Sequence, residues 1–158
     1  MRRLAVLLAT GFGLGYLPLA PATWASAATS LLLLVLVPRL PLPDFLGVTL
    51  GVTALALLVC GPAEKSLGHD ARPIVMDEVA GMFIAVAGVP AIGHANPPHV
   101  IMLVLGFLLF RVFDIWKPPP VGRAQVLPGA FGVVTDDVLA GIYTNLALRI
   151  IARAWPAS

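Results

Sequence analysis

The sequence predicts an all-α membrane protein, a small polytopic bundle with four or five apolar segments. Of its 158 residues, 59% are hydrophobic and 11% are charged, against about 45–50% and about 25% in soluble domains. Proline clusters separate the apolar runs, as breaks between helices do. Helices are also favoured because an open sheet cannot leave its edges in lipid. We therefore expect residues 1–158 to form a single membrane-embedded domain.

The N-terminal segment combines positive charge, apolar residues and glycine. Arg2 and Arg3 precede the apolar run 4–9, which resembles a signal peptide. Glycines and prolines interrupt the continuation over 11–21, so we expect the segment to stay in the protein. Its glycines favour either helix packing or a re-entrant loop whose backbone amides approach a phosphate. The two arginines suit anchoring to an anionic membrane surface.

Five apolar segments follow along the chain. Several are shorter than the about 20 residues that a perpendicular crossing needs, so we expect them to extend into neighbouring polar residues, to tilt, or to thin the bilayer locally. The segments are 22–37, 45–60, 79–92, 100–113 and 131–151.

The distribution of positive charge predicts an orientation. With five crossings and a cytoplasmic N-terminus, seven of the ten Lys and Arg residues lie inside, which the positive-inside rule favours. Polar residues within 11–23, 69–81, 111–118 and 136–141 then meet at the cytoplasmic face. The inside set is Arg2, Arg3, Lys65, Arg72, Arg111, Lys117 and Arg123, and the outside set is Arg39, Arg149 and Arg153.

Five of the eight acidic residues stand at the edges of apolar runs, where ionised groups are costly and usually pair, bind ions or carry function. Mg²⁺ prefers hard oxygen ligands and often uses carboxylates together with substrate phosphate. The alternative is that each acid pairs with a nearby cation or caps a helix. There are too few basic partners for all of them, so we predict metal binding. The acids are Asp77, Glu78, Asp114, Asp136 and Asp137.

A short sequence pattern that occurs twice predicts how these carboxylates come together. Residues 77–81 read D-E-V-A-G and residues 137–141 read D-V-L-A-G. Each has Ala three and Gly four positions after an Asp, and positions i and i+4 share a helix face. Small residues let two backbones approach closely. We therefore predict two tightly packed helices that present the acids together.

Two cations flank Asp114 in the run R-V-F-D-I-W-K-P. Arg111, Asp114 and Lys117 are spaced by three and share one helix face. One interpretation is an intrahelical ion pair with a snorkelling lysine. The other is that Arg111 and Lys117 bind phosphate oxygens while Asp114 binds metal. Pro118 is expected to end the helix.

Other polar residues are weaker candidates. Gly13 and Thr23 are candidate phosphate contacts, with Thr23 also a possible helix cap, although the segment lacks the Gly-Lys-Ser/Thr end of a P-loop. Asp70 and His69 are candidates for supporting the metal ligands. Cys60 has apolar neighbours and is expected to pack.

The charge pattern and the aromatic residues bear on partners. The net charge is +2 and no Lys/Arg cluster is present, which excludes a nucleic-acid patch. Trp116 and Trp155 suit the membrane interface.

Four stretches resemble the phosphatidylglycerophosphatase A family of bacterial lipid phosphatases. They are G-F-G-L-G-Y-L-P-L-A-P-A-T, H-D-A-R-P-I-V-M-D-E-V-A-G, R-V-F-D-I-W-K-P and T-D-D-V-L-A-G. The resemblance covers nearly the whole chain. It implies a magnesium-dependent, multi-pass enzyme of the bacterial cytoplasmic (inner) membrane that removes the terminal phosphate of a phospholipid substrate, phosphatidylglycerophosphate. The matching positions are Asp77, Glu78, Asp114, Lys117, Asp136 and Asp137.

The chain departs from this family in one loop. The family usually reads P-G-T and then Gly-Ser, whereas Ala22 and Ala25 replace the glycines here. Alanine does not easily adopt the positive φ values open to glycine, so a loop that needs them would bind phosphate differently.

Two other classes of function remain. A small ion-coupled transporter would use the same carboxylates, but near the bilayer midplane and with symmetry between its halves. A phosphotransferase acting on nucleotide-activated lipids would show paired Asp-Gly-Ala-Arg elements, which the sequence lacks.

Overall fold

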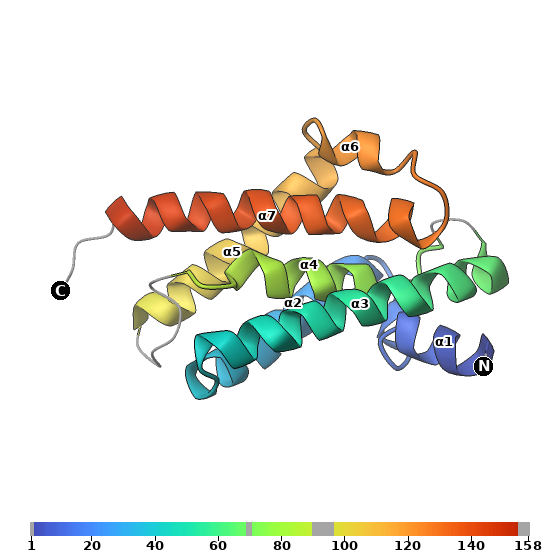
Figure 1. Ribbon diagram of the computed structural model, residues 1–158, viewed down its shortest axis with the longest axis horizontal. Helices are drawn as coiled ribbons and strands as arrows, with labels where there is room; N and C mark the ends of the chain where they lie inside the picture. Colours follow the sequence, from blue (N-terminus) through green and yellow to red (C-terminus); the bar gives the residue numbers. More distant parts are fainter. Residues whose placement is uncertain (1, 69–70, 90–96, 155–158) are drawn as a thin grey trace.

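We describe the fold from a computed structural model covering residues 2–68, 71–89 and 97–154 (Figure 1). All regular elements in these ranges are helical, as predicted. The α-helices are α1 (Arg2–Ala9), α2 (Pro21–Leu36), α3 (Leu42–Leu67), α4 (Met76–Val86), α5 (Pro97–Trp116), α6 (Val121–Ala124) and α7 (Ala130–Ala154), with 3₁₀ turns η1 (Leu14–Tyr16) and η2 (Val37–Arg39).

Three helical stretches are long and apolar enough to cross a membrane. They are Pro21–Arg39, Leu42–Leu67 and Pro98–Trp116, and they coincide with three of the predicted segments. Helix α7 coincides with a fourth and runs for 25 residues. A membrane bundle is therefore confirmed, whereas the predicted number of crossings stays a prediction.

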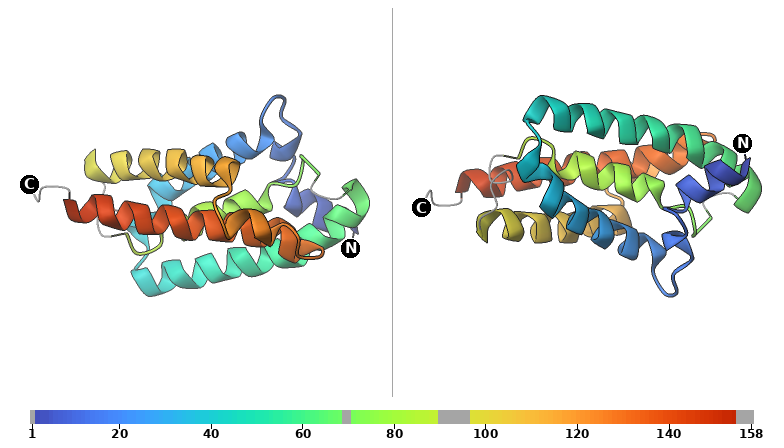
Figure 2. Two further views of the ribbon diagram at one scale, coloured as in Figure 1. Left: turned by 90° about the horizontal axis from the view of Figure 1, so that it is seen from above. Right: turned by 90° about the horizontal axis from the view of Figure 1, so that it is seen from below.

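The segment 79–92 was expected to be one of the apolar segments that cross the membrane, but α4, which covers its described part, is short. It spans 11 residues, which rise about 16 Å, roughly half of the 30 Å hydrocarbon core. Most of its side chains are buried, and α2, α3, α5 and α7 all pack against it (Figure 2). Its hydrophobicity therefore reflects burial inside the protein rather than contact with lipid.

Side chains of α7 donate hydrogen bonds to the backbone carbonyl groups at the C-terminal end of α4. The amide nitrogen of Asn145 donates to the carbonyl oxygens of Ile84, Ala85 and Ala87 at 3.0, 3.1 and 2.9 Å. Arg149 donates from Nη2 to Ala87 at 3.0 Å and from Nε to Asn145 Oδ1 at 2.7 Å. Carbonyls at a helix end lack intrahelical partners, so this contact lets α4 stop inside the bundle.

We expect Asn145→Leu to lower the free energy of unfolding by roughly 1–3 kcal/mol, because it leaves the buried Ala85 carbonyl without its donor and removes one hydrogen bond each from the Ile84 and Ala87 carbonyls. Thermal unfolding in detergent measures the effect. The exposed Leu146→Ala on the same helix is the control and should change little. Equal unfolding temperatures for Asn145→Leu and the wild type would contradict this role.

Two of the N-terminal glycines, Gly11 and Gly15, pack against the loop that leads into α4. A Cβ on Gly15 would lie 1.9 Å from the carbonyl oxygen of Pro73, and the Val75 amide donates to Ala9 at 2.9 Å. Helix α1 has eight residues and rises about 12 Å, too little to cross. At Gly15 the structure shows close packing, which holds the start of α4, whereas a re-entrant N-terminal segment stays a prediction.

Candidate metal centre

Three carboxylates form a compact group at one end of the bundle. Asp77 and Glu78 lie in the first turn of α4, and Asp137 lies in α7. All three are buried, and one oxygen from each lies within 4.8 Å of the others. Carboxylates held so close repel one another unless a cation or protons lie between them.

Close contact between α4 and α7 brings the acids together. A Cβ on Gly141 would lie 2.5 Å from the carbonyl oxygen of Gly81, and one on Gly81 would lie 2.8 Å from the carbonyl oxygen of Asp137. Real side chains do not fit at either position. The pair of tightly packed helices predicted from the repeated D-x-x-A-G pattern is therefore confirmed.

The donor set of this group suits a hard divalent cation. Its ligands are carboxylate oxygens, the type that Mg²⁺, Ca²⁺ and Mn²⁺ prefer. Glu78 Oε2 is buried and has no hydrogen-bond partner among the described residues. A buried, unsatisfied carboxylate oxygen is costly, and a bound cation would remove that cost. The group can therefore hold a metal ion.

Asp136 lies beside this group and is paired with Lys117. The Lys117 ammonium donates to Asp136 Oδ2 at 2.7 Å. Burial lowers the pKa of Lys117, but its bond to Asp136 and the other nearby carboxylates outweigh burial, so the net pKa is raised and Lys117 stays protonated.

Helix α5 ends at Trp116, directly before Lys117 and close to the break predicted at Pro118. Lys117 has φ of 48°, an uncommon value for a non-glycine residue.

Asp114 forms an ion pair with Arg111 on α5. The intrahelical ion pair, one of the two interpretations of Arg111, Asp114 and Lys117, is therefore observed. Arg111 Nη1 lies 2.8 Å from Asp114 Oδ2. The same nitrogen and Nε are buried without a well-oriented hydrogen bond in the described chain, so the contact is an ion pair of poor directionality. The Arg111 guanidinium therefore keeps donor capacity for a further acceptor.

A pocket of about 330 Å³ opens beside the carboxylates. Acidic and basic side chains face it together: Asp77 and Glu78 from α4, Arg111 from α5, and Arg72 from the loop before α4. Thr23 from α2 also lines it. Residues of three polar stretches that were expected to converge, 11–23, 69–81 and 111–118, line this pocket. The fourth stretch, 136–141, is represented by Asp137, which lies against Asp77 and Glu78. The full lining is Leu19, Ala20, Pro21, Ala22, Thr23, Ala71, Arg72, Ile74, Asp77, Glu78 and Arg111.

Arg72 lines the pocket, although the sequence indicated it only as one of the cations on the cytoplasmic side. Its signal was its place in H-D-A-R-P, five positions before Asp77, because such a short loop returns its side chain toward the start of α4. Asp70 and His69 lie outside the described residues.

Other N-terminal candidates fall in different places. Gly13 does not line the pocket in the described chain, and its amide donates to the Thr10 carbonyl. Thr23 is the third residue of α2 rather than its cap. Ala22 lies in the same first turn, and positive φ outside glycine occurs in the described chain only at Phe12, Leu19 and Lys117. Alanine at position 22 therefore needs no left-handed conformation.

Two exposed tryptophans lie on the helices that carry pocket residues. Trp116 follows Arg111 by five residues on α5, and Trp24 follows Thr23 on α2; they are 71% and 50% exposed. Tryptophan is enriched where hydrocarbon meets head groups. Both side chains therefore suit such an interface. Trp155 lies outside the described residues.

Comparisons with known proteins agree along the length of the chain. A family model described as phosphatidylglycerophosphatase A matches residues 7–152. A phosphatidylglycerophosphatase A of Haemophilus influenzae is 38% identical over 92% of this chain and 86% of its own. The Escherichia coli protein of that name is 33% identical over 95% and 84%. A provisionally named phosphatidylinositol-3-phosphatase of Bacteroides thetaiotaomicron is 33% identical over 93% and 92%. No solved structure matches the chain.

Proposed function

The chain belongs to the phosphatidylglycerophosphatase A family, and from this we propose that it hydrolyses the terminal phosphate of phosphatidylglycerophosphate. The products are phosphatidylglycerol and inorganic phosphate. We further propose that the reaction depends on Mg²⁺ and takes place at the cytoplasmic face of the bacterial inner membrane. The transporter alternative is not favoured, because the named relatives are phosphatases.

One observation carries the proposal: the buried group of Asp77, Glu78 and Asp137 adjoins a pocket that also presents Arg72 and Arg111. Carboxylates alone would repel a phosphate, and arginines alone would bind one without cleaving it. Metal ligands beside anion-binding groups are what hydrolysis of a phosphate ester needs. The position beside interfacial tryptophans suits a lipid head group.

The residues divide into three roles in this proposal. Asp77, Glu78 and Asp137 would hold the cation, with Asp114 and Asp136 next to them. A bound Mg²⁺ supplies charge neutralisation of the phosphate oxygens and a lower pKa for the attacking water. Arg111 and Arg72 bind phosphate oxygens and stabilise the charge that builds up as the bond from phosphorus to the leaving oxygen breaks. A carboxylate near the water takes its proton.

Lys117 has a supporting role in the same arrangement. Its ammonium fixes Asp136 at 2.7 Å, and the Asp136 carboxylate in turn accepts the backbone amide of Asp137 at 3.1 Å. The pair thus helps to hold Asp136 and the neighbouring Asp137 in place on α7. Lys117 also stays charged near the site and adds to the field that attracts a phosphate.

We expect Arg72→Gln to raise the KM for the lipid phosphate about 10-fold or more, because a charge-assisted hydrogen bond contributes about 1.5–3 kcal/mol. The exposed Arg123→Gln in α6 is the control, since it removes a cation outside the pocket lining. Steady-state kinetics in mixed micelles measure both. Equal KM values for the two variants would show that Arg72 does not bind substrate.

The substrate is tested with a panel of lipid phosphates that share the same acyl chains. Purified protein is given phosphatidylglycerophosphate, phosphatidic acid or phosphatidylinositol 3-phosphate with Mg²⁺, and released phosphate is measured. Preference for the first by about 10-fold or more in kcat/KM is the expected result. Preference for phosphatidylinositol 3-phosphate would transfer the assignment to the activity named for the Bacteroides relative.

A further inference from the structure

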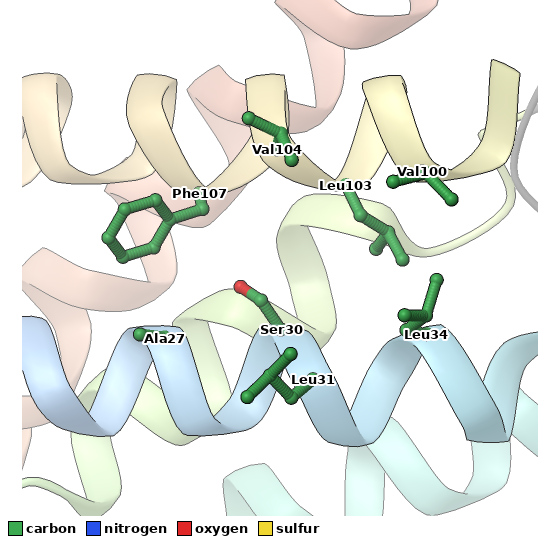
Figure 3. Close-up of a pocket in the computed structure, with 8 residues that line it drawn as sticks. All are labelled: Ala27, Ser30, Leu31, Leu34, Val100, Leu103, Val104 and Phe107. Atoms are coloured by element: carbon green, nitrogen blue, oxygen red, sulfur yellow. The ribbon is translucent and has the colours of Figure 1, made fainter. Parts of the chain in front are cut away.

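A second hollow lies between α2 and α5, away from the carboxylates. It has a volume of about 290 Å³, close to the lower end of ligand pockets at about 300 Å³. In Figure 3 the labelled side chains of the two helices face one another across it. The lining is Ala27, Ser30, Leu31 and Leu34 from α2 and Val100, Leu103, Val104 and Phe107 from α5. We call it the α2/α5 groove.

The groove offers a ligand only apolar surface. Its one polar side chain, Ser30, donates a hydrogen bond from its hydroxyl to the Ser26 carbonyl oxygen at 2.9 Å, so this donor is already used within α2. Leu31 and Val104 are 68% and 52% exposed, which shows that the groove opens at the outer surface of the bundle. Both helices belong to stretches able to cross a membrane. The groove is therefore suited to bind a hydrocarbon chain.

The groove continues the polar pocket along both of its helices. On α2, Thr23 lines the pocket and Ala27, four residues later, begins the groove. On α5, Arg111 lines the pocket and Phe107, four residues earlier, lines the groove. Residues four apart are neighbours on one helix face. The polar pocket and the groove thus form one continuous surface along α2 and α5, which we call the track. It is charged at one end and apolar over the rest.

The length of the track matches one leaflet. From Thr23 to Leu34 is eleven residues, a rise of about 16 Å, and half of the hydrocarbon core is about 15 Å. The charged end lies beside Trp24 and Trp116, which favour the head-group region. A lipid in its ordinary orientation would therefore have its phosphate at the charged end and a chain along the groove.

We propose that the α2/α5 groove binds one acyl chain of the lipid whose phosphate occupies the polar pocket. This inference rests on the proposed phosphatase function. The enzyme then recognises its substrate by two contacts, charge at the head and apolar contact along one chain. A consequence is that kcat/KM depends on acyl-chain length even when every lipid carries the same head group.

The test fills the groove and compares long-chain with short-chain substrate. Ala27→Phe places a ring in the groove, and Ala28→Phe places the same ring on the exposed neighbouring position. Each variant and the wild type receive dipalmitoyl and dihexanoyl phosphatidylglycerophosphate in the same detergent. We expect Ala27→Phe to reduce the long-to-short ratio of kcat/KM about 10-fold or more, because each buried methylene contributes to binding. Ala28→Phe should keep the wild-type ratio.

Several results would overturn the inference. An unchanged ratio in Ala27→Phe, or equal loss on both lipids, would show that no acyl chain lies in the groove. A wild-type dimer that Ala27→Phe converts to a monomer, with the ratio unchanged, would assign the groove to a second copy of the chain. If Ala27→Phe does not fold, Val104→Trp fills the groove from α5 and gives the same comparison. Absence of wild-type release from either lipid would instead reject the phosphatase function itself.

Discussion

Asp137→Asn is expected to reduce phosphate release by at least about 100-fold, the scale on which loss of one charge-stabilising group slows an enzyme. The amide keeps the size of the side chain but removes one anionic ligand from the group formed with Asp77 and Glu78. Stability without metal should be unchanged or higher, because one buried like charge is lost. Addition of Mg²⁺ should raise the unfolding temperature of the wild type but much less that of the variant.

Asp44→Asn is the matched control. Asp44 is exposed in the first turn of α3, outside both the group and the pocket lining. It should retain wild-type release and wild-type stabilisation by Mg²⁺. Near-normal turnover of Asp137→Asn, together with full stabilisation by the ion, would remove Asp137 from the metal site.

Gly141→Ala is expected to destabilise the protein by roughly 1–3 kcal/mol, the usual range for overpacking, and to reduce activity. The added methyl group would lie 2.5 Å from the Gly81 carbonyl oxygen, so α4 and α7 must separate. Because these helices carry Asp77, Glu78 and Asp137, separation also widens the metal site. Thermal unfolding and phosphate release, measured on the same preparation, report the two effects.

Gly51→Ala tests whether the loss is specific to the contact. A Cβ at Gly51 of α3 meets nothing within 4 Å, and alanine favours a helix over glycine by about 0.5–1 kcal/mol. Stability should therefore hold or rise, with activity retained. If Gly141→Ala behaved like Gly51→Ala, close packing of α4 on α7 would not be what forms the site.

Much of the site could be predicted from the sequence because its signals are local. An Asp followed by Ala and Gly on one helix face appears twice, at 77–81 and 137–141, and close approach of two helices needs small residues at those positions. The carboxylates also stood out against an apolar background. The structure joins these two observations in the contact between Gly81 and Gly141.

The parts that could not be predicted depend on contacts between distant residues. Hydropathy cannot tell a helix in lipid from one buried in protein, so the segment 79–92 was counted among the crossing segments although α4 is buried in the bundle. Its end depends on Asn145, about 60 positions away along the chain. The choice of ion pairs was also open, since Asp136 takes Lys117 rather than Arg111 only once α5 and α7 are packed.

The most direct test of the metal-centred account is phosphate release from phosphatidylglycerophosphate by the purified protein, first with a chelator and then with Mg²⁺ restored. The account predicts that release falls to background in the chelator and returns as Mg²⁺ is titrated back. Undiminished release in the chelator, from protein shown to be free of metal, would contradict it.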